Sequence, residues 1–347
     1  MALTDGIKNK LKVVANAIRS KTNKSGNLTL EQMASEVSDI DTLQGLDFSE
    51  IYDSDFNPKF NTYYQYAINR AKQLKLNWDT NTTNIITAPF RNDLELVLVP
   101  NLDFTNVQKA SSAFKECYNL EYIGELKNFK PIGDIGSMFY QCLKLKSIDE
   151  LNLTDSVSAP NIFYFCISLE GVNLKNTNKI NNFNSAFAYC TLIKELELNT
   201  DSCTNLRSCF LNCFSLKKLN ITSVENCTDF TTAFNNDAKL NILLMSNWKQ
   251  ANISLAQSIQ LSAESIKYII WYALNGDNTL GFENQGATSR TLQLHVTPYN
   301  SWGTWKLTKP SVEDCEYLGV SEEEITKYGE LTWEDIALNV KLITIAK

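Results

Sequence analysis

The chain has 347 residues, of which 44% are hydrophobic and 20% are charged, so it can bury a core and is not disordered overall. Its 32 Lys and Arg residues against 39 Asp and Glu residues give a net charge of -7, which excludes the basic footprint of a nucleic-acid partner. The single histidine, His295, leaves no room for a histidine-based metal cage or a two-histidine catalytic site.

Cysteine usage and the absence of catalytic motifs narrow the function classes further. Nine cysteines occur, an odd number without any Cys-x-x-Cys pair, so the chain is not a small disulfide scaffold. The start has no apolar run of signal-peptide length, and no membrane-spanning run is present, which predicts synthesis in a reducing cytoplasm and no membrane insertion. No phosphate loop, nucleophile elbow or metal motif appears, so we expect neither an enzyme nor a cofactor.

Residues 1–45 predict two short amphipathic helices around a polar turn at residues 21–27. The first helix has one apolar face: Leu3, Ile7, Leu11, Val14 and Ile18. Thr29 and Gln32 form a capping-box pattern before the second face, which contains Met33, Val37 and Ile40. Two such helices are not a stable domain alone, so we expect them to dock on a partner, to oligomerise or to pack on the rest of the chain.

The segment AIRSKT…GNLTLEQMASEV within residues 13–40 resembles a short helical module of phage and prophage tail, baseplate and fibre proteins. The resemblance implies an attachment or oligomerisation role, in a homotrimer as is common for such proteins. Residues 46–84 carry little periodic signal. Their apolar residues suggest a helix, and we interpret this stretch as the amino-terminal cap of the solenoid predicted next: Tyr63, Tyr66, Ala67, Ile68, Ala71 and Leu74.

Residues 85–248 contain a repeat of about 24 residues. Seven phenylalanines mark it: Phe90, Phe114, Phe139, Phe163, Phe187, Phe210 and Phe234. The third residue after each is usually cysteine: Cys117, Cys142, Cys166, Cys190 and Cys213, with Asp93 and Asp237 in the first and last units. Aliphatic residues follow six and nine positions after the phenylalanine, as at Leu120 and Ile123. Such recurrence predicts a solenoid of about seven stacked coils.

Each predicted coil contains a short strand and an opposite wall. Leu196-Glu197-Leu198 alternates apolar and polar side chains, as a half-buried strand does, while the phenylalanine faces it across the coil. We interpret the cysteines as a buried, unreactive column, because stacked side chains form a line and not the tetrahedron of a metal site. Asp93 and Asp237 are expected where a coil meets a cap or solvent.

This Phe-x-x-Cys-x-x-Leu-x-x-Ile pattern resembles the BspA-type leucine-rich repeats of bacterial surface proteins and phage proteins. The resemblance implies an α/β solenoid that serves as a binding platform.

Residues 249–347 predict a small mixed α/β cap. Ser262 caps a helix with an apolar face at Ile266, Ile269, Ile270 and Leu274, and residues 261–274 resemble the cap helix that follows such repeats in phage and gut-bacterial proteins. Residues 291–296 alternate as a strand, and Ser321 with Glu324 opens a helix that stops at Gly329. Residues 336–342 alternate again and predict a final strand.

Candidate contact residues lie in this cap. Three aromatic residues in a turn-like segment are candidate glycan contacts, and the alternative is that they plug the cap: Tyr299, Trp302 and Trp305. His295 is expected to be exposed or locally bonded. Asp149 and Glu150 are expected to point to opposite sides of a strand, which argues against an acid/base pair.

Taken together, the resemblances imply a structural virion protein of a phage tail, baseplate or fibre. It would be assembled in the host cytoplasm, would contact other tail or baseplate proteins, and would display a leucine-rich-repeat platform to a host-surface glycan or protein. Two alternatives remain open: a bacterial surface adhesin with the same repeats, and a glycan-degrading tailspike, which would need a carboxylate pair in a groove.

Overall fold

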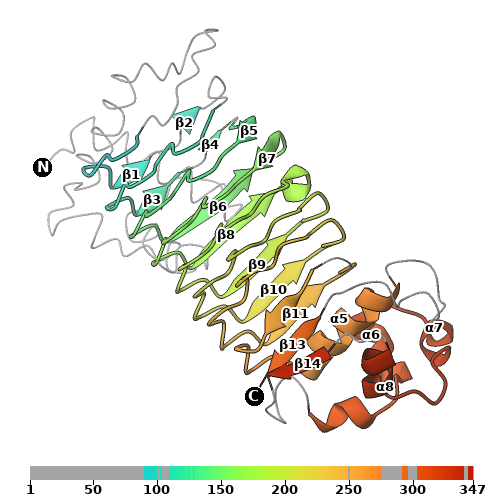
Figure 1. Cartoon of the computed structure of the whole chain (residues 1–347). Coiled ribbons are helices and arrows are strands. Elements are labelled where there is room, and N and C mark those ends of the chain that lie inside the picture. Colours follow the sequence, from blue (N-terminus) through green and yellow to red (C-terminus); the bar gives the residue numbers. More distant parts are fainter. Residues whose placement is uncertain are drawn as a thin grey trace, which may run out of the picture. The chain divides into compact units, whose positions relative to one another are not determined.

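The computed structural model describes residues 90–99, 102–103, 109–124, 126–127, 129–248, 251–275, 291–295, 303–339 and 343–346. The predicted helical module at residues 1–45 and the predicted cap at residues 46–84 lie outside these residues. Within them, coils follow one another from residue 90 to residue 248, and the helices of the carboxy-terminal region lie beyond the last coil (Figure 1). The predicted leucine-rich-repeat solenoid is confirmed for this part of the chain.

One short parallel strand from each coil builds the sheet side of the solenoid. These strands form two successive parallel sheets, together called the main sheet below. The first contains β1 (Leu98–Val99), β3 (Tyr122–Ile123), β6 (Ser147–Asn152) and β8 (Gly171–Lys175), and the second contains β9 (Glu195–Leu198), β10 (Lys218–Ile221) and β11 (Ile242–Met245). The pairing keeps repeat positions in register, for example Leu196 with Leu219 and Leu219 with Leu243. Identical inward positions therefore meet in the core of neighbouring coils.

Smaller elements complete the coils. Strands β2 (Leu102–Asp103) and β4 (Leu126–Lys127) pair in parallel, as do β5 (Gly133–Asp134) and β7 (Ser156–Ser158). A 3-10 turn, η2, spans Thr177–Lys179. Because each of these pairings again joins one coil to the next, the backbone ladder is not confined to the main sheet.

The wall opposite the sheet is a tight turn built around the repeat phenylalanine. Residues two before and two after it adopt positive φ, as at Ser185 (φ 53) and Tyr189 (φ 66), although neither is glycine. Because of this left-handed geometry, successive backbone N–H groups point alternately to the next coil and back into their own turn. The N–H of Phe187 donates to Cys209 in the next coil (2.9 Å), whereas the N–H of Ala186 donates to Phe183 within its own turn (3.0 Å). The hydrogen bonds offset a cost of about 1–2 kcal/mol for each left-handed residue.

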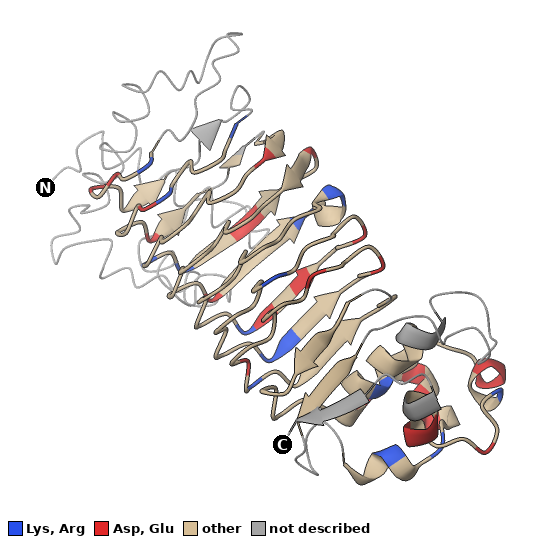
Figure 2. Ribbon diagram, in the orientation of Figure 1, with Lys and Arg blue, Asp and Glu red and all other residues tan. Residues whose placement is uncertain are grey.

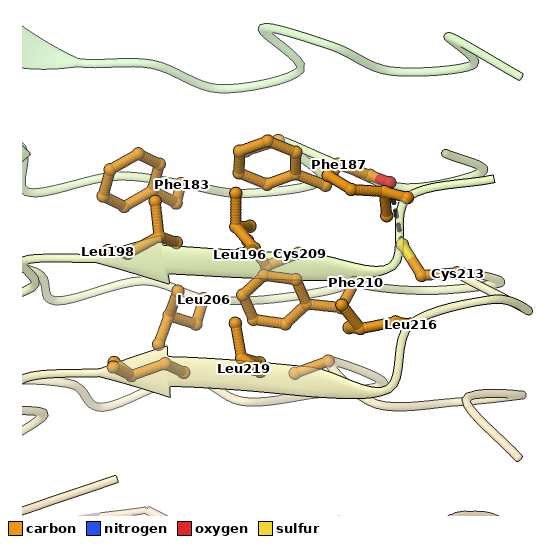
Figure 3. Packing of buried hydrophobic residues seen from close by; sticks show 14 of the residues in the cluster. Phe183, Phe187, Leu196, Leu198, Leu206, Cys209, Phe210, Cys213, Leu216 and Leu219 are labelled. Atoms are coloured by element: carbon orange, nitrogen blue, oxygen red, sulfur yellow. Dashed lines mark hydrogen bonds between the residues drawn. The ribbon is translucent and has the colours of Figure 1, made fainter. Parts of the chain in front are cut away.

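The core is a set of columns along the solenoid. All seven repeat phenylalanines are buried, and successive rings stack with centroids 5.2–6.1 Å apart. Figure 3 shows two of these rings, Phe187 and Phe210, facing the inward leucines of the strands. Each coil therefore buries its apolar surface against its neighbours, as expected for a repeat that cannot form a core alone.

The carboxy-terminal region begins with β12 (Ile253–Leu255) and helix α5 (Ala263–Asn275). Strand β13 (Leu292–His295) pairs with both β12 and β14 (Ile343–Ala346) in a parallel sheet. The 3-10 turns η4 (Thr304–Leu307) and η5 (Val312–Asp314) precede helices α6 (Cys315–Leu318), α7 (Glu322–Thr326) and α8 (Trp333–Asn339). The predicted helix starts at Ser262 and Ser321 are confirmed, and the strand predicted at residues 291–296 is confirmed over Leu292–His295.

Helix α5 ends the main sheet at β11. The hydroxyl of Ser265 accepts a hydrogen bond from the N–H of Leu243 (3.0 Å), and the N–H of Ser262 donates to the carbonyl of Asn241 (2.8 Å). These contacts occupy backbone groups that a following coil would otherwise have paired. An open edge strand is a template for pairing with another chain, and α5 removes that risk at this end.

The predicted strand over residues 336–342 is wrong in its first half, because residues 333–339 form α8. Thr332 and Asp335 make a reciprocal capping box, in which each side chain accepts a hydrogen bond from the backbone N–H of the other. Trp333, Ile336 and Ala337 are then buried on one helical face. The alternation of apolar residues predicts a strand here, whereas the capping box predicts the start of a helix. The structure follows the capping box.

Candidate functional site

The cysteine column is part of the core. Each thiol donates a hydrogen bond to the carbonyl oxygen of the repeat phenylalanine in the preceding coil, from Cys117 to Phe90 (2.9 Å) through to Cys213 with Phe187 (3.2 Å) (Figure 3). Burial raises the pKa of Cys117 to about 12 and raises the pKa of the other four thiols as well. Neutral, hydrogen-bonded thiols are neither nucleophiles nor metal ligands, so this column stabilises the coil stack.

Asp237 takes the position of the thiol in the last coil. It is fully buried, and its Oδ1 atom accepts a hydrogen bond from the N–H of Cys213 (3.0 Å). Burial raises its pKa well above the usual value. Next to it, the N–H of Asn236 donates to the side chain of Gln257, so this position meets the cap and not solvent. Asp93, in the first unit, is also buried, and its carboxylate accepts the N–H of Glu95 (3.2 Å).

The sheet side of the solenoid presents charged residues of both signs. Exposed carboxylates stand on β6 and β9, and exposed lysine stands on β10 (Figure 2). Lysines reach carboxylates of neighbouring coils, as in Lys146 with Glu121 (3.8 Å) and Lys194 with Glu170 (3.6 Å). Such exposed pairs contribute little to stability, and their mixed signs give this side no single-sign field.

Asp149 and Glu150 depart from the expected alternation. A shift of register between Ile148 and Leu151 inserts one extra residue into β6 relative to β8, and both carboxylates are exposed. The expectation that adjacent residues on this strand point to opposite sides is therefore wrong, because a bulge interrupts the pleat.

The turn side carries a group of half-buried aromatic residues that periodicity did not predict. This aromatic strip consists of Tyr140, Tyr164, Phe165 and Tyr189, which follow the repeat phenylalanine by one or two positions. The rings of Tyr140 and Tyr164 stack with centroids 5.0 Å apart, and those of Phe165 and Tyr189 lie 4.8 Å apart. Lys115 Nζ lies 4.7 Å from the centroid of Tyr140. The stacked faces are occupied, so the strip offers ring edges and phenol hydroxyls.

Exposed apolar side chains occur in the same turns, four positions after the repeat phenylalanine. This apolar ridge consists of Leu94 (55% exposed), Tyr118 (37%), Ile167 (36%) and Phe214 (49%). Together the aromatic strip and the apolar ridge are called the turn-side surface below. Amide side chains stand among them at Gln141 and Asn212. A recurring exposed apolar position that the core does not use is a candidate contact surface.

Of the candidate residues in the carboxy-terminal cap, the structure describes Trp305 and His295. Trp305 lies in η4, is half-buried and contacts the core of the cap. Tyr299 and Trp302 lie outside the described residues. His295 is half-buried at the end of β13. Among the residues that the structure describes, no group of three His, Cys, Asp or Glu side chains is placed to hold a metal ion. No helix in the same part of the chain is long and apolar enough to cross a membrane.

Comparison with known proteins identifies the repeat. Residues 104–241 match the family model of the BspA type leucine rich repeat region in six copies. No curated protein matches the chain. The resemblance drawn from the phenylalanine and cysteine spacing is thus confirmed for the repeats, and repeats of this type fit a surface-binding, adhesin-type role.

Proposed function

We propose that this chain is a non-enzymatic display protein whose leucine-rich-repeat solenoid binds a host-surface glycan through its turn-side surface. The observation that carries the proposal is the recurrence of exposed apolar side chains at outward turn positions. Tyr118 and Phe214 offer apolar rings to sugar faces, while the amides of Gln141 and Asn212 offer hydrogen bonds to hydroxyls. Nothing in the stacking of the coils requires these outward residues to be apolar.

The location that we propose is a phage or prophage tail, baseplate or fibre. Support comes from the resemblance of residues 13–40 to the helical module of such proteins and of residues 261–274 to their cap helix. In this proposal residues 1–45 attach the protein to other virion proteins and form a homotrimer, and the solenoid is displayed to the host. The alternative location is a bacterial surface, where the same repeats would act as an adhesin.

Replacement of exposed rings tests the binding surface. The variants Tyr118→Ser and Phe214→Ser should each weaken binding to purified host-surface polysaccharide by about tenfold, equal to about 1.4 kcal/mol, if the rings contact sugar. Glu197→Gln on the sheet side is the matched control and should bind as the unchanged chain does. A Trp305→Ala variant that loses binding while both ring variants retain it would transfer the contact to the cap and contradict our assignment.

Two further measurements address location and chemistry. Mass spectrometry of purified virions should find the chain at stoichiometric copy number. Its absence from virions, together with its detection on the bacterial surface, would support the adhesin alternative. Incubation with the same polysaccharide should leave the chain length of the glycan unchanged, and any released oligosaccharide would contradict the proposal that the protein is not an enzyme.

A further inference from the structure

Cys203 and Cys227 are buried thiols of a different kind from the column. They occupy the same place in two adjacent coils, because Asn205 and Asp229, two residues further on, pair as a parallel bridge. The N–H of Thr228 also donates to the carbonyl of Thr204 (2.9 Å). Adjacent parallel chains lie about 4.8 Å apart, which is within the Cα separation that a disulfide accepts.

The two thiols interact with each other. Their Sγ atoms donate to equivalent carbonyl oxygens, that of Asn205 (3.5 Å) and that of Asp229 (3.7 Å), so the two thiols have matching positions in the adjacent coils. The hydrogen bond from Cys227 lowers the pKa of Cys203, and the same bond raises the pKa of Cys227. The column thiols are instead directed at phenylalanine carbonyls, and burial raises their pKa.

Both thiols lie just beneath the surface. Ser202 and Thr204 flank Cys203 and are exposed, and the residues on either side of Cys227 are exposed as well. Opening of one short turn therefore brings Cys203 to solvent, without separation of the coils.

We propose that Cys203 and Cys227 form a disulfide between adjacent coils when the protein meets a low-molecular-weight disulfide such as oxidised glutathione. The thiolate of Cys203 attacks one sulfur of the reagent, which forms a mixed disulfide and expels one glutathione thiolate. Cys227 then gives its proton to solvent, and its sulfur attacks Sγ of Cys203 and expels the second glutathione. Two protein thiols are oxidised and one glutathione disulfide is reduced to two thiols.

The bond would add a covalent link between two coils that are otherwise joined only by the polypeptide backbone and by non-covalent contacts. In a solenoid each coil contacts only its neighbours, so a covalent link at one junction prevents the stack from opening there. An oxidising exterior favours the linked form and a reducing cytoplasm favours the thiols. This inference does not depend on the proposed glycan contact, because neither Cys203 nor Cys227 belongs to the turn-side surface. The disulfide needs only an oxidant.

Peptide mapping of the whole unmodified chain tests the proposal. The native protein is treated with oxidised glutathione, free thiols are alkylated, and trypsin is applied without reductant. Cleavage after Lys194, Arg207, Lys218 and Lys239 places Cys203 in residues 195–207 and Cys227 in residues 219–239, each as the single cysteine of its peptide. The expected result is that these two peptides are joined in the main disulfide product, and that reduction separates them.

The column supplies a matched internal control. Cys166 and Cys190 are also single cysteines, in tryptic peptides 147–175 and 180–194, and they should remain unlinked. In Cys227→Ser, the glutathione adduct should persist on Cys203, because the second thiol is missing. Absence of the 195–207 to 219–239 link in the unmodified chain, or equal yield of the column link, would overturn the proposal.

Discussion

The solenoid and the carboxy-terminal cap are stabilised in different ways. Each coil repeats the contacts of the one before it: a stacked phenylalanine, a thiol on a carbonyl and a strand in register. The cap depends on contacts that occur once, chiefly Lys267 of α5 with Asp314 of η5 (2.7 Å) and the cluster of Trp271, Tyr328 and Trp333. A repeated contact distributes stability along the chain, whereas a single contact concentrates it at one junction.

The largest expected effect is the loss of a ring from the middle of the phenylalanine column. Phe163 is fully buried and stacks on Phe139 (5.3 Å) and Phe187 (5.4 Å). Phe163→Ala should lower the free energy of unfolding by about 3–5 kcal/mol, because it leaves a cavity between two coils. Urea unfolding followed by far-ultraviolet circular dichroism measures the change.

Phe214→Ala provides the control, since that ring is 49% exposed and lies in another coil of the same solenoid. It should cost less than about 1 kcal/mol, as most surface substitutions do. Equal losses for the two variants would mean that the column is not the source of solenoid stability.

The second effect concerns the most buried ion pair that the structure describes in the cap, Lys267 with Asp314. Lys267 and Asp314 are both largely buried, and Asp314 also accepts hydrogen bonds from Tyr317 (2.5 Å) and the N–H of Ser311 (2.9 Å). Burial alone would raise the pKa of Asp314, but the hydrogen bonds from Lys267, Tyr317 and Ser311 outweigh it and lower the pKa. Lys267→Met leaves a buried carboxylate without its cation and should destabilise the cap by about 3 kcal/mol.

Tryptophan fluorescence reports on this change, because Trp271 and Trp333 lie in the cap. Lys309→Met is the matched control in the same region, since Lys309 pairs with the exposed carboxylate of Glu330 and should matter by less than about 1 kcal/mol. A fluorescence transition that both variants leave unchanged would show that the ion pair does not hold the cap.

How much the sequence could predict depends on the same difference between contacts that repeat in every coil and contacts that occur once. Periodicity predicted the columns, the strands and the repeat family because every coil supplied independent evidence for the same positions. It did not predict the aromatic strip, since Tyr140 and Tyr164 occupy a position whose residue varies between coils and is arginine, lysine, alanine, leucine or asparagine in the others. It also misassigned α8, because the capping box of Thr332 and Asp335 occurs once and no repeat reinforced it.

The smallest expected effect is a pH dependence of stability that differs between the two regions. It arises from Asp237 in the last coil and from Asp314 in the cap. Burial holds the pKa of Asp237 above its ordinary 3.8, so the folded chain keeps a proton that the unfolded chain has released. Its contribution to stability is complete below pH 3.8 and is lost as the pH rises through the folded-state pKa. The pKa of Asp314 is lowered, so its contribution is present above pH 3.8 and is lost in more acid solution.

Asp237→Asn removes the titration and supplies an amide donor where the other coils have a thiol that donates to the phenylalanine carbonyl. At neutral pH the variant should be more stable than the unchanged chain by about 1 kcal/mol, the contribution of one buried hydrogen bond. The difference should shrink as the pH is lowered toward 3.8, because the carboxyl of the unfolded chain then also begins to take up its proton. Thermal unfolding of the two proteins across this range measures the difference, and a gap that stays constant with pH would mean that Asp237 is ionised in the folded chain. The cap, followed by tryptophan fluorescence in the same samples, should keep its stability over this range and lose it only in more acid solution, where Asp314 takes up a proton and its ion pair with Lys267 is lost.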